Sequence, residues 1–161
     1  MAALIARHAM HSEPYVAARM WQIAVQEGWF VGLRPGMGTV LASGVILTED
    51  ERQTKTLLLN DCLSEAWQRY AIAHELAHEI LGHRSVFALR AGAVESRQED
   101  EADDAAALVL VPECLLHLDM GEITRRCVVP VGVVQRRLSL AGVERDERLG
   151  ETCVGSVLRP C

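Results

Sequence analysis

The segment 65–81 constrains the fold more than any other part of the sequence. It is apolar almost all round a helical wheel, which is typical of a helix buried inside a domain, and Gly82 is a typical residue to follow its last turn. Within this apolar helix stand three titratable side chains: His74, Glu75 and His78. Their burial costs free energy unless they are paired or bound to a metal ion.

His74 and His78 lie four residues apart, so a helix presents both imidazoles on one face. Such a pair can bind one zinc ion. Glu75, rotated by about 100° around the helix, would lie beside the ion as general base for a zinc-bound water molecule. We therefore predict His74 and His78 as metal ligands and Glu75 as the catalytic residue. The alternative, two structural histidines, is disfavoured by the apolar context of the pair.

A catalytic zinc ion normally takes a third protein ligand. The next predicted helix, 98–110, begins with an acidic cluster and has an apolar face at helical spacing: Ala102, Ala105, Ala106 and Val109. Glu99 lies on that face, three residues before Ala102, so we predict Glu99 as the third ligand. Asp103 lies on the adjoining strip, where it could accept a hydrogen bond from a ligand imidazole. Glu101 remains the alternative ligand.

A further histidine, His83, follows the motif closely. The metzincin pattern requires a glycine seven residues, and a histidine ten residues, after the first histidine. Gly82 and His83 come eight and nine residues after His74, so the register is wrong. We do not expect His83 to bind the metal ion.

The 161 residues, half of them hydrophobic, fit a single globular domain. Two segments rich in leucine or β-branched residues, 44–48 and 55–60, flank a polar stretch and predict a β-hairpin. The glycine-rich residues 32–44 are expected to form a loop. Further helices are predicted at 14–27, 112–119, 122–127 and 131–140.

The formal net charge of −6 counts against a protein that coats nucleic acid. The longest run without a charged residue, 35–48, is shorter than the ~20 residues that span a bilayer, and residues 1–10 lack the apolar stretch of a signal peptide. We therefore expect a cytoplasmic protein with no membrane partner. The five cysteines contain no Cys-x-x-Cys pair, so a cysteine-type zinc site is not expected.

The segment 69–78, Arg-Tyr-Ala-Ile-Ala-His-Glu-Leu-Ala-His, with the following Ile80-Leu81-Gly82-His83, resembles the ImmA/IrrE family of metallopeptidases. The similarity covers residues 45–112 and includes the strand Leu57-Leu58-Leu59-Asn60 and the acidic, alanine-rich helix that ends before Pro112. Ala105 departs from the phenylalanine usual in the family. The stretch 127–138 resembles the family's C-terminal helix-turn-helix-like segment, with Pro130 where a small hydroxyl residue is common.

This resemblance implies an α+β fold: a compact zincin-like (gluzincin-like) domain with a short β-sheet beside the His74–His78 helix, then the helix of Glu99 and small C-terminal helices. We expect one metallopeptidase domain at 1–142, with a catalytic core at 14–112 and a helical segment at 113–142 that resembles a helix-turn-helix, followed by a tail at 143–161. The resemblance also implies a Zn²⁺-dependent endopeptidase with a protein substrate. Family members often cleave a helix-turn-helix repressor of a mobile element or a stress regulon.

Two other functions stay open. The chain could be a catalytically idle, zinc-containing interaction module, although the expected signature, loss of Glu75, is not present. It could instead bind DNA through its C-terminal helices, whose basic residues are Arg125, Arg126, Arg136 and Arg137. The net charge of −6 makes direct binding of nucleic acid the weaker alternative. For a peptidase, strand 56–60 could offer a free edge to an extended substrate.

Overall fold

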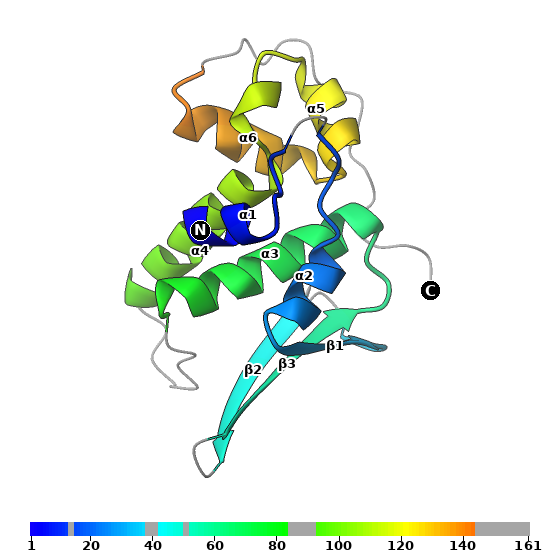
Figure 1. The fold of residues 1–161 in the computed structure, drawn as a ribbon, viewed down its shortest axis with the longest axis vertical. Helices are drawn as coiled ribbons and strands as arrows, with labels where there is room; N and C mark the ends of the chain where they lie inside the picture. The colour runs from blue at the N-terminus through cyan, green and yellow to red at the C-terminus, as the bar shows by residue number, and fades with distance from the viewer. Residues whose placement is uncertain (13–14, 38–41, 50–51, 84–92, 144–161) are drawn as a thin grey trace.

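A three-stranded sheet and a set of helices form an α+β structure in the computed structural model, which describes residues 1–12, 15–37, 42–49, 52–83 and 93–143 (Figure 1). The strands are β1 (Trp29–Arg34), β2 (Ala42–Glu49) and β3 (Arg52–Asn60). The helices are α1 (Ala2–Arg7), α2 (Met20–Gln26), α3 (Glu65–Leu81), α4 (Ala93–Leu110), the 3-10 turn η1 (Glu113–Leu115), α5 (Met120–Cys127) and α6 (Val131–Leu140).

The sheet has the order β1-β3-β2. β2 and β3 pair antiparallel, from Ala42 opposite Leu59 to Glu49 opposite Arg52, which confirms the predicted hairpin and lengthens both strands. β1 pairs parallel with the other side of β3. β3 is therefore the central strand, and the expectation that residues 56–60 offer a free edge is wrong, because β1 and β2 already use both sides of this strand.

The N-terminal third of the chain differs most from the predictions. Residues 32–34 belong to β1 rather than to a loop, because their partner strand lies far along the chain and local sequence carries no signal for that pairing. The helix predicted at 14–27 begins only at Met20. Just before it, the carbonyl of Ala18 accepts a hydrogen bond from the buried Arg69, a contact that a continuous helix would compete with. Gly28, with φ +88°, follows the helix as expected.

The two long helices agree with the sequence. α3 has the predicted bounds and is followed by Gly82 at φ +70°. α4 covers the predicted residues 98–110 and begins earlier, at Ala93. The helix predicted at 112–119 is wrong, because only η1 forms there and Asp119 instead caps α5 by accepting a bond from the Glu122 amide, 2.8 Å long. Helices predicted at 122–127 and 131–140 correspond to α5 and α6.

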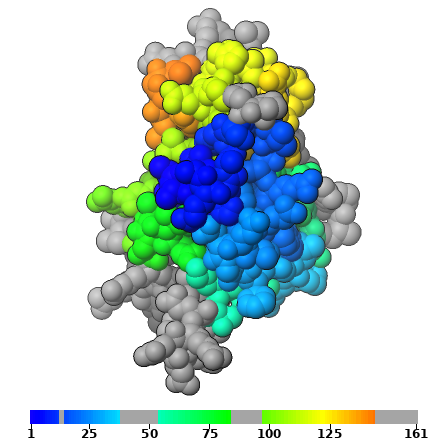
Figure 2. All heavy atoms as spheres, in the orientation of Figure 1, coloured from blue at the N-terminus to red at the C-terminus, as the bar shows by residue number. Residues whose placement is uncertain are grey.

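α3 lies between the sheet and α4, and small side chains line its contact with α4. Ala73 and Ala77 on α3, and Ala102 and Ala106 on α4, are completely buried, so the two backbones can approach closely. α1 and α2 lie across the front of the molecule (blue in Figure 2) and contribute Leu4, Met20 and Ile23 to the core. Among the described residues, no helix is both long and apolar enough to cross a membrane.

Candidate metal centre

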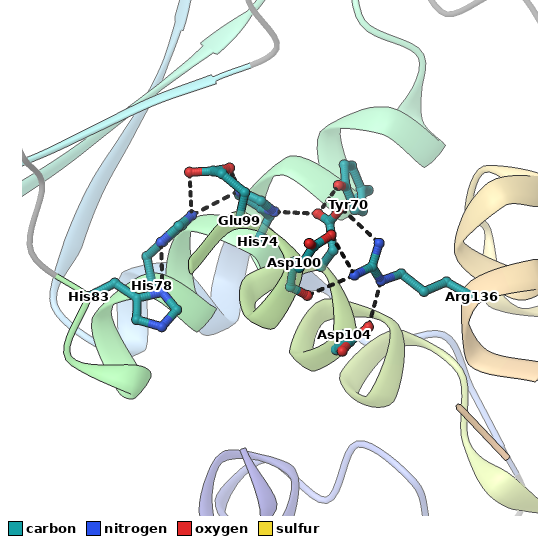
Figure 3. Close-up of polar contacts among 9 residues, drawn as sticks. Tyr70, His74, His78, His83, Glu99, Asp100, Asp104 and Arg136 are labelled. Carbon is teal, nitrogen blue, oxygen red and sulfur yellow. Dashed lines mark hydrogen bonds and ion pairs between the residues drawn. The ribbon is translucent and has the colours of Figure 1, made fainter. Parts of the chain in front are cut away.

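Three side chains from α3 and α4 converge where these helices lie side by side (Figure 3). His74 and His78 project from successive turns of α3, and Glu99 projects from the first half of α4. One potential ligand atom from each lies within 4.8 Å of the others. The predicted apolar face of α4 explains this arrangement, because Ala102 and Ala106 are fully buried against α3 and Glu99 lies on the same face one turn earlier.

The spacing of the potential ligand atoms fits tetrahedral coordination of a metal ion. The Nε2 atoms of His74 and His78 lie 3.0 Å apart, and the Glu99 carboxylate oxygens lie 3.1 Å from His74 Nε2 and 3.4 Å from His78 Nε2. Zinc bonds of 2.0–2.1 Å at tetrahedral angles separate neighbouring ligand atoms by about 3.3 Å. The side chain of Glu99 is 55% exposed, whereas those of His74 and His78 are 16% and 22% exposed, so the cluster opens to solvent on the side of Glu99.

Asp103 contacts the ring nitrogen of His74 that is directed away from the cluster. Its Oδ1 lies 2.8 Å from Nδ1 of His74, the hydrogen bond expected from the sequence, and also accepts a bond from the Tyr70 hydroxyl. Burial alone would lower the pKa of His74, but Asp103, with smaller contributions from Glu99 and Glu75, outweighs it and raises this pKa. Burial would raise the pKa of Asp103, yet His74 and Tyr70 hold it below its ordinary value. Tyr70 is therefore a partner of Asp103 in this structure.

The ring of His78 has neighbours on both sides (Figure 3). Its Nε2 faces His74 and Glu99, while its Nδ1 lies 3.0 Å from Nδ1 of His83. Burial, followed by the charge of His74, lowers the pKa of His78. Glu101, the alternative third ligand, is directed to His83 Nε2 at 3.1 Å and to Arg97 Nε at 2.8 Å. The cluster of potential ligand atoms contains Glu99 and not Glu101.

Glu75 is half-buried on α3 between the two histidines. Its negative charge contributes to the raised pKa of His74, which places its carboxylate within electrostatic reach of the cluster. The role of Glu75 as the catalytic base stays a prediction.

The basic residues of the C-terminal helices already have partners within the chain. Arg136 on α6 reaches α4, where it contacts Asp100, Asp103 and Asp104, with the shortest contact, 2.6 Å, to Asp104 (Figure 3). Arg137 is buried and donates to the carbonyl of Val111. Arg125 and Arg126 both pair with Glu122. These contacts count against the alternative in which the four arginines bind DNA phosphates.

Comparison with known proteins agrees with the geometry. The profile of the IrrE N-terminal-like domain, of the peptidase family M78, matches residues 41–139. This span contains both long helices and all three clustered side chains.

The chain belongs to this family. It is therefore a metallopeptidase of the M78 type. No curated protein matches the chain.

Sequence reasoning missed two residues that contact this centre. The register of the motif excludes His83 as a ligand and does not predict its contact with His78. A signal existed, because a glycine that terminates a helix brings the next residue back over the last turn. In the sequence, Arg136 is one of four basic residues of the C-terminal helices, and its contact with Asp103 depends on how α6 packs on α4.

Proposed function

We propose that the chain is a zinc-dependent endopeptidase with a gluzincin-like centre, in which His74, His78 and Glu99 hold the metal ion. The convergence of these three ligand atoms within 4.8 Å, in a chain of a metallopeptidase family, carries the proposal. Two imidazoles and one carboxylate are a donor set of catalytic zinc sites, which keep one position for water or substrate. The exposed side of Glu99 is where a polypeptide could approach.

Glu75 is the proposed catalytic base. When bound at this centre, zinc lowers the pKa of a water molecule to about 7 and polarises the peptide carbonyl. The Glu75 carboxylate accepts the proton of the attacking water molecule and returns it to the departing amine. Asp103 fixes the orientation of the His74 ring, and its own position is held by Tyr70 and Arg136.

The proposed substrate is a regulatory protein, a helix-turn-helix repressor of a mobile element or a stress regulon. This substrate class comes from the resemblance to the ImmA/IrrE family. Direct binding of nucleic acid is not part of the proposal, since the arginines of α5 and α6 have acidic or carbonyl partners.

Metal analysis of the purified chain tests the centre. With zinc in excess, we expect about one zinc ion per chain in the wild type and in Glu101→Ala, and loss of the ion in His78→Ala and Glu99→Ala. The exposed His117 provides a matched control, because His117→Ala removes a histidine that lies outside the cluster. A wild-type chain that takes up no zinc would overturn the proposal.

Cleavage of a repressor by the zinc-loaded chain tests the activity. Glu75→Gln keeps the size of the side chain but removes the base, so we expect unchanged zinc content and a rate lower by about 10²–10⁴-fold. Equal cleavage by Glu75→Gln and wild type would exclude Glu75 as the base. Zinc binding without cleavage of any helix-turn-helix repressor tested would favour the idle interaction module.

A further inference from the structure

His83 is brought to the metal centre by the way α3 ends. Gly82 adopts the left-handed conformation, and the chain turns back over the last helical turn. The Gly82 amide donates to the carbonyl of Glu79 at 3.0 Å, and the His83 amide donates to the carbonyl of His78 at 2.9 Å. This pair of bonds is the Schellman motif. It fixes the backbone of His83 directly beside His78.

The imidazole of His83 lies between His78 and Glu101. Its Nδ1 is 3.0 Å from Nδ1 of His78, and its Nε2 is 3.1 Å from a carboxylate oxygen of Glu101. Only 7% of the His83 side chain is exposed, so its ring is largely shielded from water, whereas the Glu101 side chain is 43% exposed. Arg97, through its 2.8 Å bond to the other carboxylate oxygen, holds Glu101 in place.

His78, His83 and Glu101 form a row of hydrogen-bonded side chains. The donor and acceptor in each of its hydrogen bonds can be assigned by starting from Glu101. An ionised carboxylate only accepts, so Nε2 of His83 carries the proton that bonds to Glu101. In the neutral ring, Nδ1 of His83 then has a lone pair and accepts from Nδ1–H of His78. The remaining nitrogen of His78, Nε2, therefore has its lone pair free to point at the cluster with His74 and Glu99.

We propose that His83 and Glu101 are positioning residues that hold His78 in the tautomer and ring orientation required of a metal ligand. On the other ligand, Asp103 does the same for His74 directly, with an Oδ1 to Nδ1 distance of 2.8 Å. His78 has a second imidazole between itself and the carboxylate, because Glu101 lies two residues from both Glu99 and Asp103, about half a turn around α4 from the strip that reaches His74. This inference rests on the proposed zinc centre.

Zinc affinity, measured by competition with a chromogenic chelator, tests whether His83 and Glu101 position His78. Mutation of a side chain that hydrogen-bonds to a metal ligand typically weakens metal affinity by about 10–100-fold, so we expect His83→Ala to weaken zinc binding by about that factor. His83→Asn places an amide oxygen near the original Nδ1, accepts from His78 and should recover part of the affinity. Glu101→Ala should also weaken binding, and the control His117→Ala should not change it.

Thermal melting of the zinc-free chains separates positioning from a general loss of structure. The proposal requires His83→Ala and His83→Asn to melt at similar temperatures while differing in zinc affinity. Wild-type affinity in His83→Ala would overturn it. Equal zinc affinities in His83→Ala and His83→Asn would also overturn the proposal, since loss of packing would then explain the effect. A loss of zinc binding in His83→Ala as complete as in His78→Ala would overturn it as well, since His83 would then be a ligand. Failure of the wild type itself to bind zinc would instead remove the proposed function, and this inference with it.

Discussion

Arg69 on α3 joins three separate parts of the chain, and its removal should destabilise the fold strongly. Its guanidinium donates to the carbonyls of Val128 and Cys127, both at 3.0 Å, and to the carbonyl of Ala18. The first two acceptors lie at the C-terminal end of α5, where a positive charge also interacts favourably with the helix dipole. Only 7% of Arg69 is exposed, so water cannot replace these bonds.

The expected magnitude follows from this geometry. A hydrogen bond from a charged donor contributes about 1.5–3 kcal/mol, but the cost of burying the guanidinium offsets part of the three contributions. Because Arg69→Met refills the space and leaves the three carbonyls without this donor, we expect a loss of about 3 kcal/mol in the free energy of unfolding. At this chain length that corresponds to a melting temperature lower by roughly 6–12 °C.

Urea denaturation followed by circular dichroism measures this loss. Arg34, an exposed arginine on β1, supplies the matched control Arg34→Met, which should stay within about 0.5 kcal/mol of wild type. Arg69→Lys should be intermediate, because one ammonium group cannot replace the planar set of donors. A loss of less than about 1 kcal/mol in Arg69→Met, or one equal to that of Arg34→Met, would refute the reasoning.

Three further predictions concern charge, pH and backbone conformation. Arg136→Ala should cost about 1 kcal/mol at low salt, and thermal melts of variant and wild type should converge as salt screens its pairs with α4. Burial opposes ionisation of Glu27, but His8 and Arg7 lower the pKa of this carboxyl. The stability that ionised Glu27 contributes should be fully present above its ordinary pKa of 4.5 and be lost as the pH falls through its lower pKa in the folded protein. Measuring the free energy of unfolding of Glu27→Gln and wild type at decreasing pH checks this, because the difference between them should disappear in acid. Gly82→Ala should lower the melting temperature, because φ is +70° there and a side chain costs about 1–2 kcal/mol, whereas Gly132→Ala within α6 should raise it.

Local sequence was sufficient for the parts of the fold where one helix face is buried. The bounds of α3 and most of α4 followed from apolar periodicity and from Gly82, and the same periodicity favoured Glu99 over Glu101. The structure places Glu99, rather than Glu101, with His74 and His78. The position of Glu99 follows from helical phase because two alanine-lined helices in close contact leave little freedom in how they are rotated.

The remaining features depend on contacts between distant segments. β1 forms because it pairs with β3, each residue with a partner 26 positions later, and no periodicity in residues 29–34 indicates that partner. The residues before α2 are not helical, since Ala18 bonds to Arg69 on another helix. The row from His78 through His83 to Glu101 likewise requires α4 to lie against the end of α3. In each case the decisive partner is far away in sequence.

Lys55 is the only lysine in the chain, and the structure gives it a defined place. From β3 its ammonium group contacts Glu79 near the end of α3, and Glu79 also accepts a 2.6 Å bond from the indole of Trp29. An amine-directed reagent would therefore find one side-chain target, and the contact with Glu79 should slow its reaction there. The rate of modification at Lys55, resolved from the terminal amine by peptide mapping, would report how often the contact between Lys55 and Glu79 opens in the unaltered protein.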